Sequence, residues 1–168
     1  DNGSDFAGNI PVEQLRRSAR DKLRLPSDEF MFLFVGQHIW EKNLEFLLEA
    51  LAEIRTLPFR MYFIGSGYAA SELRRKTEDL YLTDKVIFMG SITERERLKL
   101  YYAAADLFLF PSLYDNAPLV VREAAALHTP SLLIKGSTSA EVIHDSVNGF
   151  LSDNSVTAYA SRISQLLE

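Results

Sequence analysis

The sequence has no cysteine among its 168 residues and only three histidines, His38, His128 and His144, which lie far apart. The absence of cysteine excludes a disulfide framework and thiolate chemistry. The histidines show no ligand-like spacing, and no other cluster of metal ligands is visible, so the sequence predicts no metal site.

The chain also lacks a long apolar run and an excess of basic residues. No stretch approaches the roughly 18 apolar residues that cross a bilayer, and no signal peptide opens the chain. Eighteen basic and twenty-three acidic residues give a net charge of −5. That balance argues against a nucleic-acid partner. These absences favour a cytoplasmic protein.

Hydrophobic periodicity is the main structural signal. Short apolar runs, several of which end in glycine or proline, alternate with stretches whose apolar residues recur at helical spacing. We expect buried strands at 31–35, 60–64, 86–89, 106–110 and 131–134, and helices near 44–51, 69–81, 93–105, 118–127, 140–143 and 156–166. Such alternation is typical of an α/β protein with a Rossmann-like, doubly wound parallel sheet.

The N-terminal region is expected to be less regular. Residues 1–12 mix Asn, Gly, Ser and Pro and are predicted to form a linker or lead-in, with one domain at 13–168. Residues 13–25 fit either a short amphipathic helix or an irregular arm. Thr93 and Glu96 make a Thr-x-x-Glu pattern, which predicts a capping box at the start of the helix that follows.

Several signatures of nucleotide-binding and hydrolytic enzymes are incomplete or missing. Gly65 and Gly67 resemble the start of a dinucleotide fingerprint, but the third glycine and the later acidic residue are absent. The chain has neither a Gly-x-x-x-x-Gly-Lys phosphate loop nor a Gly-x-Ser-x-Gly nucleophile elbow. NAD binding is therefore disfavoured, and the P-loop and hydrolase classes are excluded.

The segment 111–126 carries the most chemical information. Asp115 stands just before a predicted helix, and Glu123 lies eight positions later, inside it. The free N–H groups at the start of that helix, at Leu119 and Val120, suit a phosphate. Two carboxylates around an anion site match the ribose, diphosphate and hexose of a sugar nucleotide. The alternative is that Asp115 or Asn116 only caps the helix and that Glu123 is solvated or paired.

From about residue 30 onward, the sequence resembles the C-terminal domain of glycosyltransferase family 4 (group 1), whose enzymes have the GT-B fold. The resemblance rests on six segments in order. They are the Gly36-to-Lys42 segment, the glycines at 65–67 and 90, the run 104–112, the acid-x7-Glu signature from Asp115 to Glu123, the His128-Thr129-Pro130 and Glu141 segments, and Asn148-Gly149-Phe150-Leu151.

This resemblance implies roles for individual residues. Glu123 is expected to bind the ribose hydroxyls, Asp115 a hexose hydroxyl, and Lys42, with the amides of Leu119 and Val120, the diphosphate; these three side chains are the expected catalytic residues. The loops at Gly67 and at Gly90 to Ile92 are expected to receive the base. The remaining donor-binding candidates are Gly36, Gln37, His38 and Asn116. Family members of this type need no metal or other cofactor beyond the donor, which is expected to be a UDP-sugar such as UDP-glucose.

The sequence departs from the family at four positions. Gln37 replaces an arginine, Asp115 a glutamate, and Pro118 and His128 replace glycines. We therefore expect His38 or Lys42 to supply more of the charge at the phosphates. The segment that contains Asp115 resembles a bacterial branch with glycolipid-forming glucosyltransferases. A peripheral membrane or lipid acceptor is accordingly expected for the full-length protein.

The resemblance implies retaining transfer of a hexose by a two-domain enzyme. The acceptor-binding N-terminal domain is expected to be missing from this chain, which would then bind nucleotide without turnover. Three alternatives stay open from the sequence: a non-catalytic nucleotide-binding module, an epimerase of sugar nucleotides with the same architecture, and a flavodoxin-like or response-regulator domain.

Overall fold

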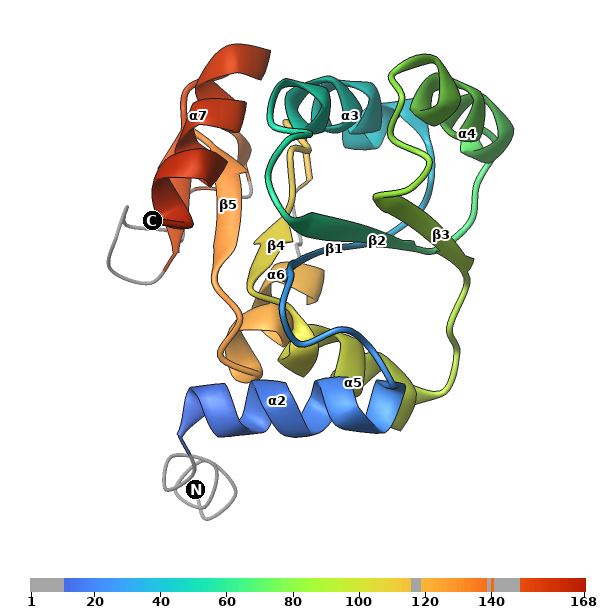
Figure 1. Ribbon diagram of the computed structural model, residues 1–168. Helices are drawn as coiled ribbons and strands as arrows, with labels where there is room; N and C mark the ends of the chain where they lie inside the picture. The colour runs from blue at the N-terminus through green and yellow to red at the C-terminus, as the bar shows by residue number, and fades with distance from the viewer. Residues whose placement is uncertain (1–10, 116–118, 139, 141–148) are drawn as a thin grey trace.

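The computed structural model describes residues 11–115, 119–138, 140 and 149–168, and the strands in them form one six-stranded sheet (Figure 1). The order across the sheet is β3-β2-β1-β4-β5-β6, and every neighbouring pair is parallel. The strands are β1 (Phe30–Val35), β2 (Phe59–Ile64), β3 (Val86–Gly90), β4 (Leu107–Leu109), β5 (Ser131–Ile134) and β6 (Phe150–Ser152). The predicted doubly wound sheet is confirmed.

The five predicted strands match β1 to β5 to within two residues, but β6 was not predicted. It has only three residues and pairs with β5, with Phe150 opposite Leu132. A strand this short offers too few positions for a period-2 pattern to be recognised. The helix expected at 140–143 falls largely outside the described residues.

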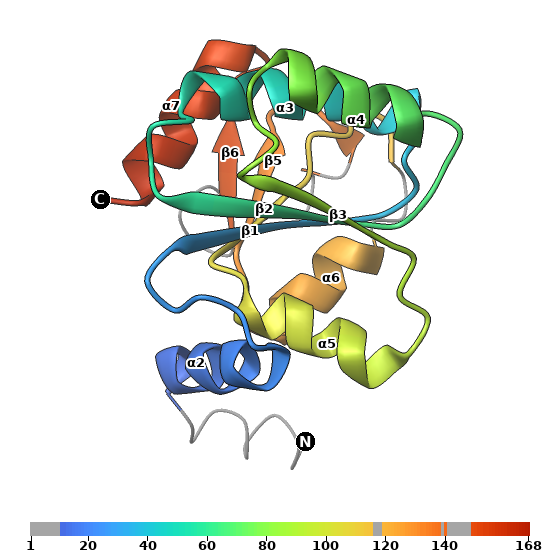
Figure 2. The same ribbon diagram turned by 45° about the vertical axis from the view of Figure 1, so that its right-hand side comes forward.

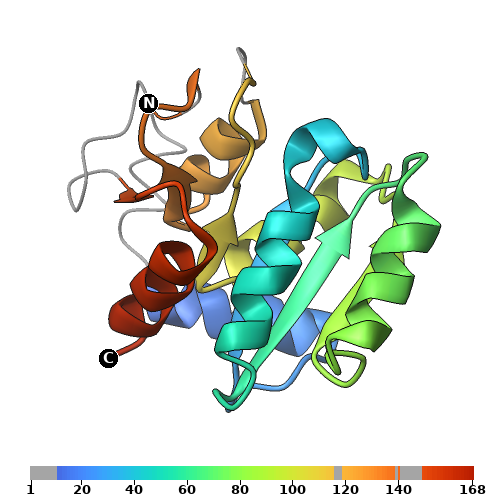
Figure 3. The ribbon, with the colours of Figure 1, turned by 90° about the horizontal axis from the view of Figure 1, so that it is seen from above.

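Helices cover both faces of the sheet. They are α2 (Val12–Leu23), α3 (Leu44–Glu53), α4 (Ala70–Asp79), α5 (Arg95–Ala104), α6 (Leu119–Ala126) and α7 (Val156–Leu166). In Figure 2, α3, α4 and α7 lie on one side of the sheet and α2, α5 and α6 on the other. Seen from above, α7, α3 and α4 lie side by side (Figure 3). This arrangement buries the strands on both faces, which explains their nearly continuous apolar sequences.

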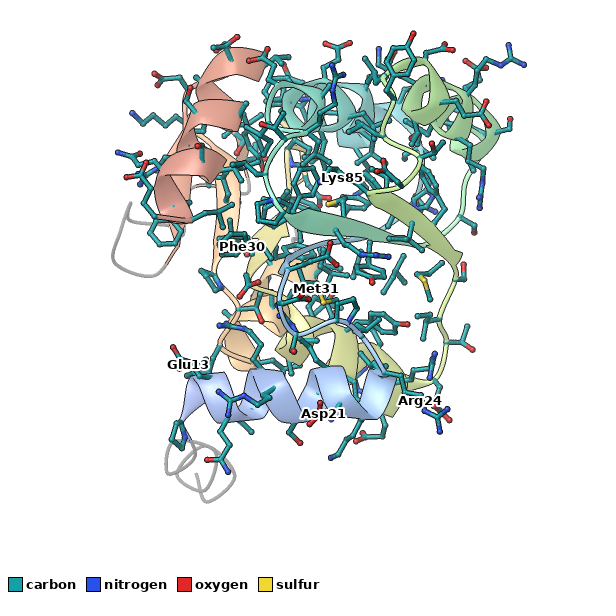
Figure 4. All side chains as sticks on the ribbon, viewed as in Figure 1. Glu13, Asp21, Arg24, Phe30, Met31 and Lys85 are labelled. Atoms are coloured by element: carbon teal, nitrogen blue, oxygen red, sulfur yellow. The ribbon has the colours of Figure 1, made fainter. Side chains whose placement is uncertain are left out.

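The segment 13–25 forms a helix rather than an irregular arm, since α2 runs from Val12 to Leu23 and packs against α5. Arg20 is buried on its inner face and donates to Asp106 Oδ2 at 2.7 Å, an oxygen that also accepts the backbone N–H of Met31. The charged residues Glu13 and Asp21 lie on α2 and Arg24 follows its end; all three are exposed, and Met31 of β1 lies above them (Figure 4).

The predicted capping box at α5 is wrong. The N-cap of α5 is Glu94, and its side chain makes no capping hydrogen bond. Thr93 therefore lies one residue outside the position that the pattern requires, and Glu96 is the second residue of the helix instead of the third. The helix itself forms because its inner face buries Tyr101, Tyr102 and Ala104.

Candidate active site

The strand order reverses between β1 and β4. The chain moves outward from β1 through β2 to β3, and then returns to the other side of β1 as β4. In open parallel sheets, ligands bind beyond the carboxyl ends of the strands at the point where the order reverses. The two loops that flank this point run from Gly36 to Asn43, after β1, and from Phe110 to Asp115, after β4.

Asn43 ties these two loops together. A short 3₁₀ turn, η1 (Trp40–Lys42), ends at Asn43, whose backbone has the left-handed φ of 62° that asparagine tolerates well. The Asn43 side-chain amide donates to the carbonyl oxygen of Pro111 at 3.1 Å. This contact fixes the position of Lys42 relative to the end of β4.

Lys42, in the loop after β1, forms an ion pair with Asp115, in the loop after β4. The Lys42 ammonium lies 2.5 Å from Asp115 Oδ2 and 5.8 Å from the centre of the buried Phe110 ring. The side chains of the two ionic partners are only 22% and 19% exposed. The structure therefore brings together the two residues that were predicted to hold the diphosphate and the hexose, and it pairs them with each other.

Glu123 has different partners. One of its carboxylate oxygens accepts a hydrogen bond from the Tyr102 hydroxyl at 3.1 Å, and the other lies 4.0 Å from an Arg95 nitrogen. Tyr102 and Arg95 belong to α5, and Glu123 belongs to α6. Together with Leu98 and other residues of these helices, they line a cavity of about 110 Å³. The structure thus joins Asp115 to Lys42 and Glu123 to α5.

A larger cleft of about 310 Å³ opens at the carboxyl ends of β1, β2 and β3. Its lining includes three of the residues predicted to bind the donor, Gly36, Gln37 and Ile92, together with Ser66. The Ser91 hydroxyl donates to the Ser66 hydroxyl at 3.1 Å, which ties two of the lining loops together. Gly36, Gln37 and Ile92 therefore share one opening, and the binding of the base near Ile92 stays a prediction.

Gly65 and Gly67 allow the loops under this cleft to touch. A Cβ atom on Gly65 would lie 1.9 Å from the Gly36 carbonyl oxygen, and one on Gly67 would lie 2.4 Å from the His38 carbonyl oxygen. Backbone hydrogen bonds join the same loops, because His38 N–H donates to Ser66 and its carbonyl accepts from Ala69. Close packing of backbone is thus the role that the structure gives to both glycines.

The His38 ring is 2% exposed and packs among Phe34, Phe63 and Phe88. Among the residues that the structure describes, none forms a hydrogen bond with its Nε2 atom. Burial, and secondarily the charge of Arg74, lower the pKa of His38 below its usual value. A neutral, enclosed imidazole does not add the positive charge that the replacement of an arginine by Gln37 was expected to require, so its role in donor binding stays a prediction.

The start of α6 lies at the edge of the described region. Leu119 is the first residue of the helix as described and its side chain is 61% exposed, while Val120 is half-buried. Asn116 and Pro118 lie outside the described residues. The expected anion site at the amides of Leu119 and Val120 therefore stays a prediction.

Known proteins share sequence with this chain. The sequence pattern of the family described as glycosyl transferases group 1 matches residues 16–168. The chain belongs to this family. An uncharacterized glycosyltransferase of Methanocaldococcus jannaschii is 31% identical over 146 residues, which are 86% of this chain and 37% of that protein. The chain thus spans little more than a third of the length of this curated relative.

Solved structures of other proteins have the same fold. The C-terminal domain of a glycosyl transferase group 1 family protein from Francisella tularensis matches with a TM-score of 0.78 and 21% identity, over 90% of this chain and 82% of that chain. HepE from Anabaena, solved with UDP and glucose, matches with a TM-score of 0.75 and 22% identity, over 92% of this chain and 43% of that chain. These likenesses show the fold: this group 1 chain has the architecture of a C-terminal GT-B domain.

A further cavity of about 530 Å³ lies between β6 and α7. Its basic side chains already have protein partners: Lys135 lies 3.4 Å from Asp153, and Arg162 donates to Leu151 and Gln165. In the described part of the chain, no three His, Cys, Asp or Glu residues are grouped to hold a metal ion, and no helix is long and apolar enough to cross a lipid bilayer.

Two contributors to the site were not predicted as functional. They are Tyr102 and Asn43. The preference of asparagine for a left-handed backbone was a usable signal for Asn43. The contact between Tyr102 and Glu123 joins residues 21 positions apart on different helices, so no local pattern indicates it.

Proposed function

We propose that this chain is the donor-binding domain of a retaining glycosyltransferase that transfers a hexose from a UDP-sugar. The observation that carries the proposal is the pairing of Lys42 with Asp115 beyond the carboxyl ends of β1 and β4. A cation and a carboxylate at this point can serve the diphosphate and the hexose of one donor. UDP is the proposed nucleotide because a structure of the HepE protein contains UDP and glucose.

In this proposal each charged residue acts on a different part of the donor. The Lys42 ammonium and the amides of Leu119 and Val120 stabilise the negative charge that develops on the departing diphosphate. Asp115 accepts a hydrogen bond from a hexose hydroxyl, and Glu123 accepts from the ribose hydroxyls. The cleft lined by Gly36, Ser66 and Ile92 receives the base.

The acceptor is proposed to bind to a second domain. The chain covers 37% of the length of its relative from Methanocaldococcus jannaschii, which leaves room for another α/β domain in proteins of that size. Because transfer needs both substrates in one cleft, this chain alone is proposed to bind the nucleotide without turning over the sugar.

Isothermal titration of the chain with UDP, GDP and ADP tests this function. We expect UDP to bind, and Lys42→Ala to weaken UDP binding at least about tenfold, since hydrogen bonds to charged groups contribute about 1.5–3 kcal/mol. Glu49→Gln is the matched control, because Glu49 pairs with Lys76 at 2.7 Å, away from Lys42. A chain that binds none of the three nucleotides contradicts the proposal.

A further inference from the structure

Asp115 and a bound diphosphate would compete for the ammonium group of Lys42. Both the Asp115 carboxylate and a diphosphate are anions that need the same ammonium, and in the structure Asp115 holds it at 2.5 Å. Both side chains are about four-fifths shielded from solvent. A diphosphate that takes Lys42 therefore leaves a poorly solvated carboxylate without its cation and close to two new negative charges.

The hexose of an intact donor changes this balance. Its hydroxyl groups can donate hydrogen bonds to Asp115, which compensate the carboxylate for the loss of Lys42. A nucleoside diphosphate carries no hexose, so it separates the ion pair without donating hexose hydrogen bonds to Asp115. The two ligands share the same phosphates and differ in what they supply to Asp115.

We propose that Asp115 is a specificity-determining residue that makes the site favour the intact sugar nucleotide over the spent nucleoside diphosphate. Asp115 competes with the diphosphate for Lys42, and only a ligand with a hexose relieves that competition. The same competition helps the spent nucleotide to leave after transfer. This inference rests on the proposed function, because it requires the diphosphate to bind at Lys42.

The geometry around the pair supports direct competition rather than independent binding. The hydrogen bond from Asn43 to Pro111, at 3.1 Å, joins the two loops and holds the Lys42 stem beside the end of β4. Phe110, whose side chain is fully buried, lies beneath the ammonium. These contacts place the Lys42 ammonium beside Asp115, over the Phe110 ring, so a phosphate that pairs with Lys42 comes close to the Asp115 carboxylate.

Titration of Asp115→Asn with UDP and with UDP-glucose tests the inference. This change keeps the shape of the side chain and removes its charge. We expect UDP to bind at least fivefold more tightly than to the unsubstituted chain, and the preference for UDP-glucose over UDP to fall. Glu49→Gln controls for the change in net charge, and the thermal unfolding midpoint of each variant shows that it is folded.

A Lys42→Ala background separates competition for the ammonium from general repulsion. If Asp115 acts through Lys42, most of the gain in UDP affinity from Asp115→Asn disappears when Lys42 is absent. A gain of the same size in both backgrounds overturns the inference. So does a UDP affinity that is unchanged or weaker in Asp115→Asn, although UDP binding by the unsubstituted chain would then leave the proposed function intact. Binding of neither UDP nor UDP-glucose to the unsubstituted chain overturns both.

Discussion

The Tyr102 hydroxyl controls the direction of one carboxylate at the site. Tyr102 is 1% exposed, packs against Phe108 with ring centres 5.7 Å apart, and donates to Glu123. Burial, and then the charge of Glu123, raise the pKa of Tyr102 well above its usual range. The hydroxyl therefore stays protonated and keeps donating to Glu123 at every pH at which the protein is studied.

Tyr102→Phe is expected to weaken UDP binding by about three- to tenfold, because the loss of one hydrogen bond costs about 0.5–1.5 kcal/mol and leaves Glu123 less well directed. The matched control is Tyr159→Phe, which removes a buried hydroxyl that donates to Leu132 at 2.7 Å from the other side of the sheet. Calorimetry of both variants checks the prediction. An equal effect of the two substitutions would show that Tyr102 acts only on stability.

His38 makes the stability of the folded domain depend on pH. Its pKa is lowered in the folded protein by burial and by Arg74, whereas the unfolded chain binds a proton near pH 6.5. The unfolded state therefore gains a proton before the folded state does as the pH falls. Stability from the neutral imidazole is present above about pH 6.5 and is lost as the pH falls below that value.

His38→Phe is expected to remove this loss, since phenylalanine fits a site formed by three phenylalanine rings and does not titrate. Between pH 7.5 and 5.5, the free energy of unfolding in urea should fall by up to about 1.4 kcal/mol more for the unsubstituted chain than for the variant. His128→Gln, at an exposed histidine, should keep the original pH dependence. Parallel pH profiles for all three proteins would contradict the account.

Candidate site residues could be proposed from the sequence, but their contacts with one another could not. Lys42, Asp115 and Glu123 were found from their spacing and from the family resemblance. That Lys42 contacts Asp115 depends on β1 lying beside β4, which is a property of the sheet. The sequence also indicated a polar role for His38, whereas the fold encloses its ring among aromatic side chains.

At the scale of elements, the loops after β1 and β2 depend on each other. The Gly65 backbone adopts a φ of 137° and lies against the Gly36 carbonyl, where a Cβ atom has no room. Gly90 also has a positive φ, 74°, but a Cβ atom there would meet nothing within 4 Å. An alanine at Gly65 would face both a steric collision and a strained backbone, whereas an alanine at Gly90 would face only the strained backbone. Comparison of the two substitutions therefore isolates the cost of the collision.

Gly65→Ala is expected to lower the free energy of unfolding by at least about 3 kcal/mol, because backbone must move away from the new methyl group. Gly90→Ala should cost only about 1–2 kcal/mol, which is the conformational penalty for alanine at a left-handed position. Urea denaturation of the two variants compares these costs. Equal losses of stability would show that the loops separate easily and that Gly36 does not pack as described.

Elements with strong periodicity were predictable, and short or shifted ones were not. The stripe Leu44, Leu47, Leu48 and Leu51 is fully buried in α3, because tertiary packing follows the same period. The capping pattern at Thr93 failed since the position of a helix start depends on packing as well as on local sequence. The β6 strand forms because β5 offers it a free edge, which the sequence of residues 150–152 does not reveal.

At the scale of the whole molecule, the strand order brings the separate parts of the site together. The order β3-β2-β1-β4-β5-β6 places the loops after β1 and β4 side by side, although Lys42 and Asp115 are 73 residues apart in sequence. The alternation of strands and helices predicted a doubly wound sheet, but not the place at which the order reverses. In open parallel sheets, that reversal is the place where ligands bind.

The central claim is that the diphosphate of a nucleotide binds at Lys42, beyond the carboxyl ends of β1 and β4. Amide chemical shifts of the isotope-labelled chain, followed during a titration with UDP, test this claim most directly. We expect the largest changes at Gly36 to Asn43, at Ser91 and Ile92, and at Leu119 to Glu123, with small changes at α7. Shifts confined to the cavity between β6 and α7, or no shifts at Lys42 and Leu119 under saturating UDP, would contradict the account.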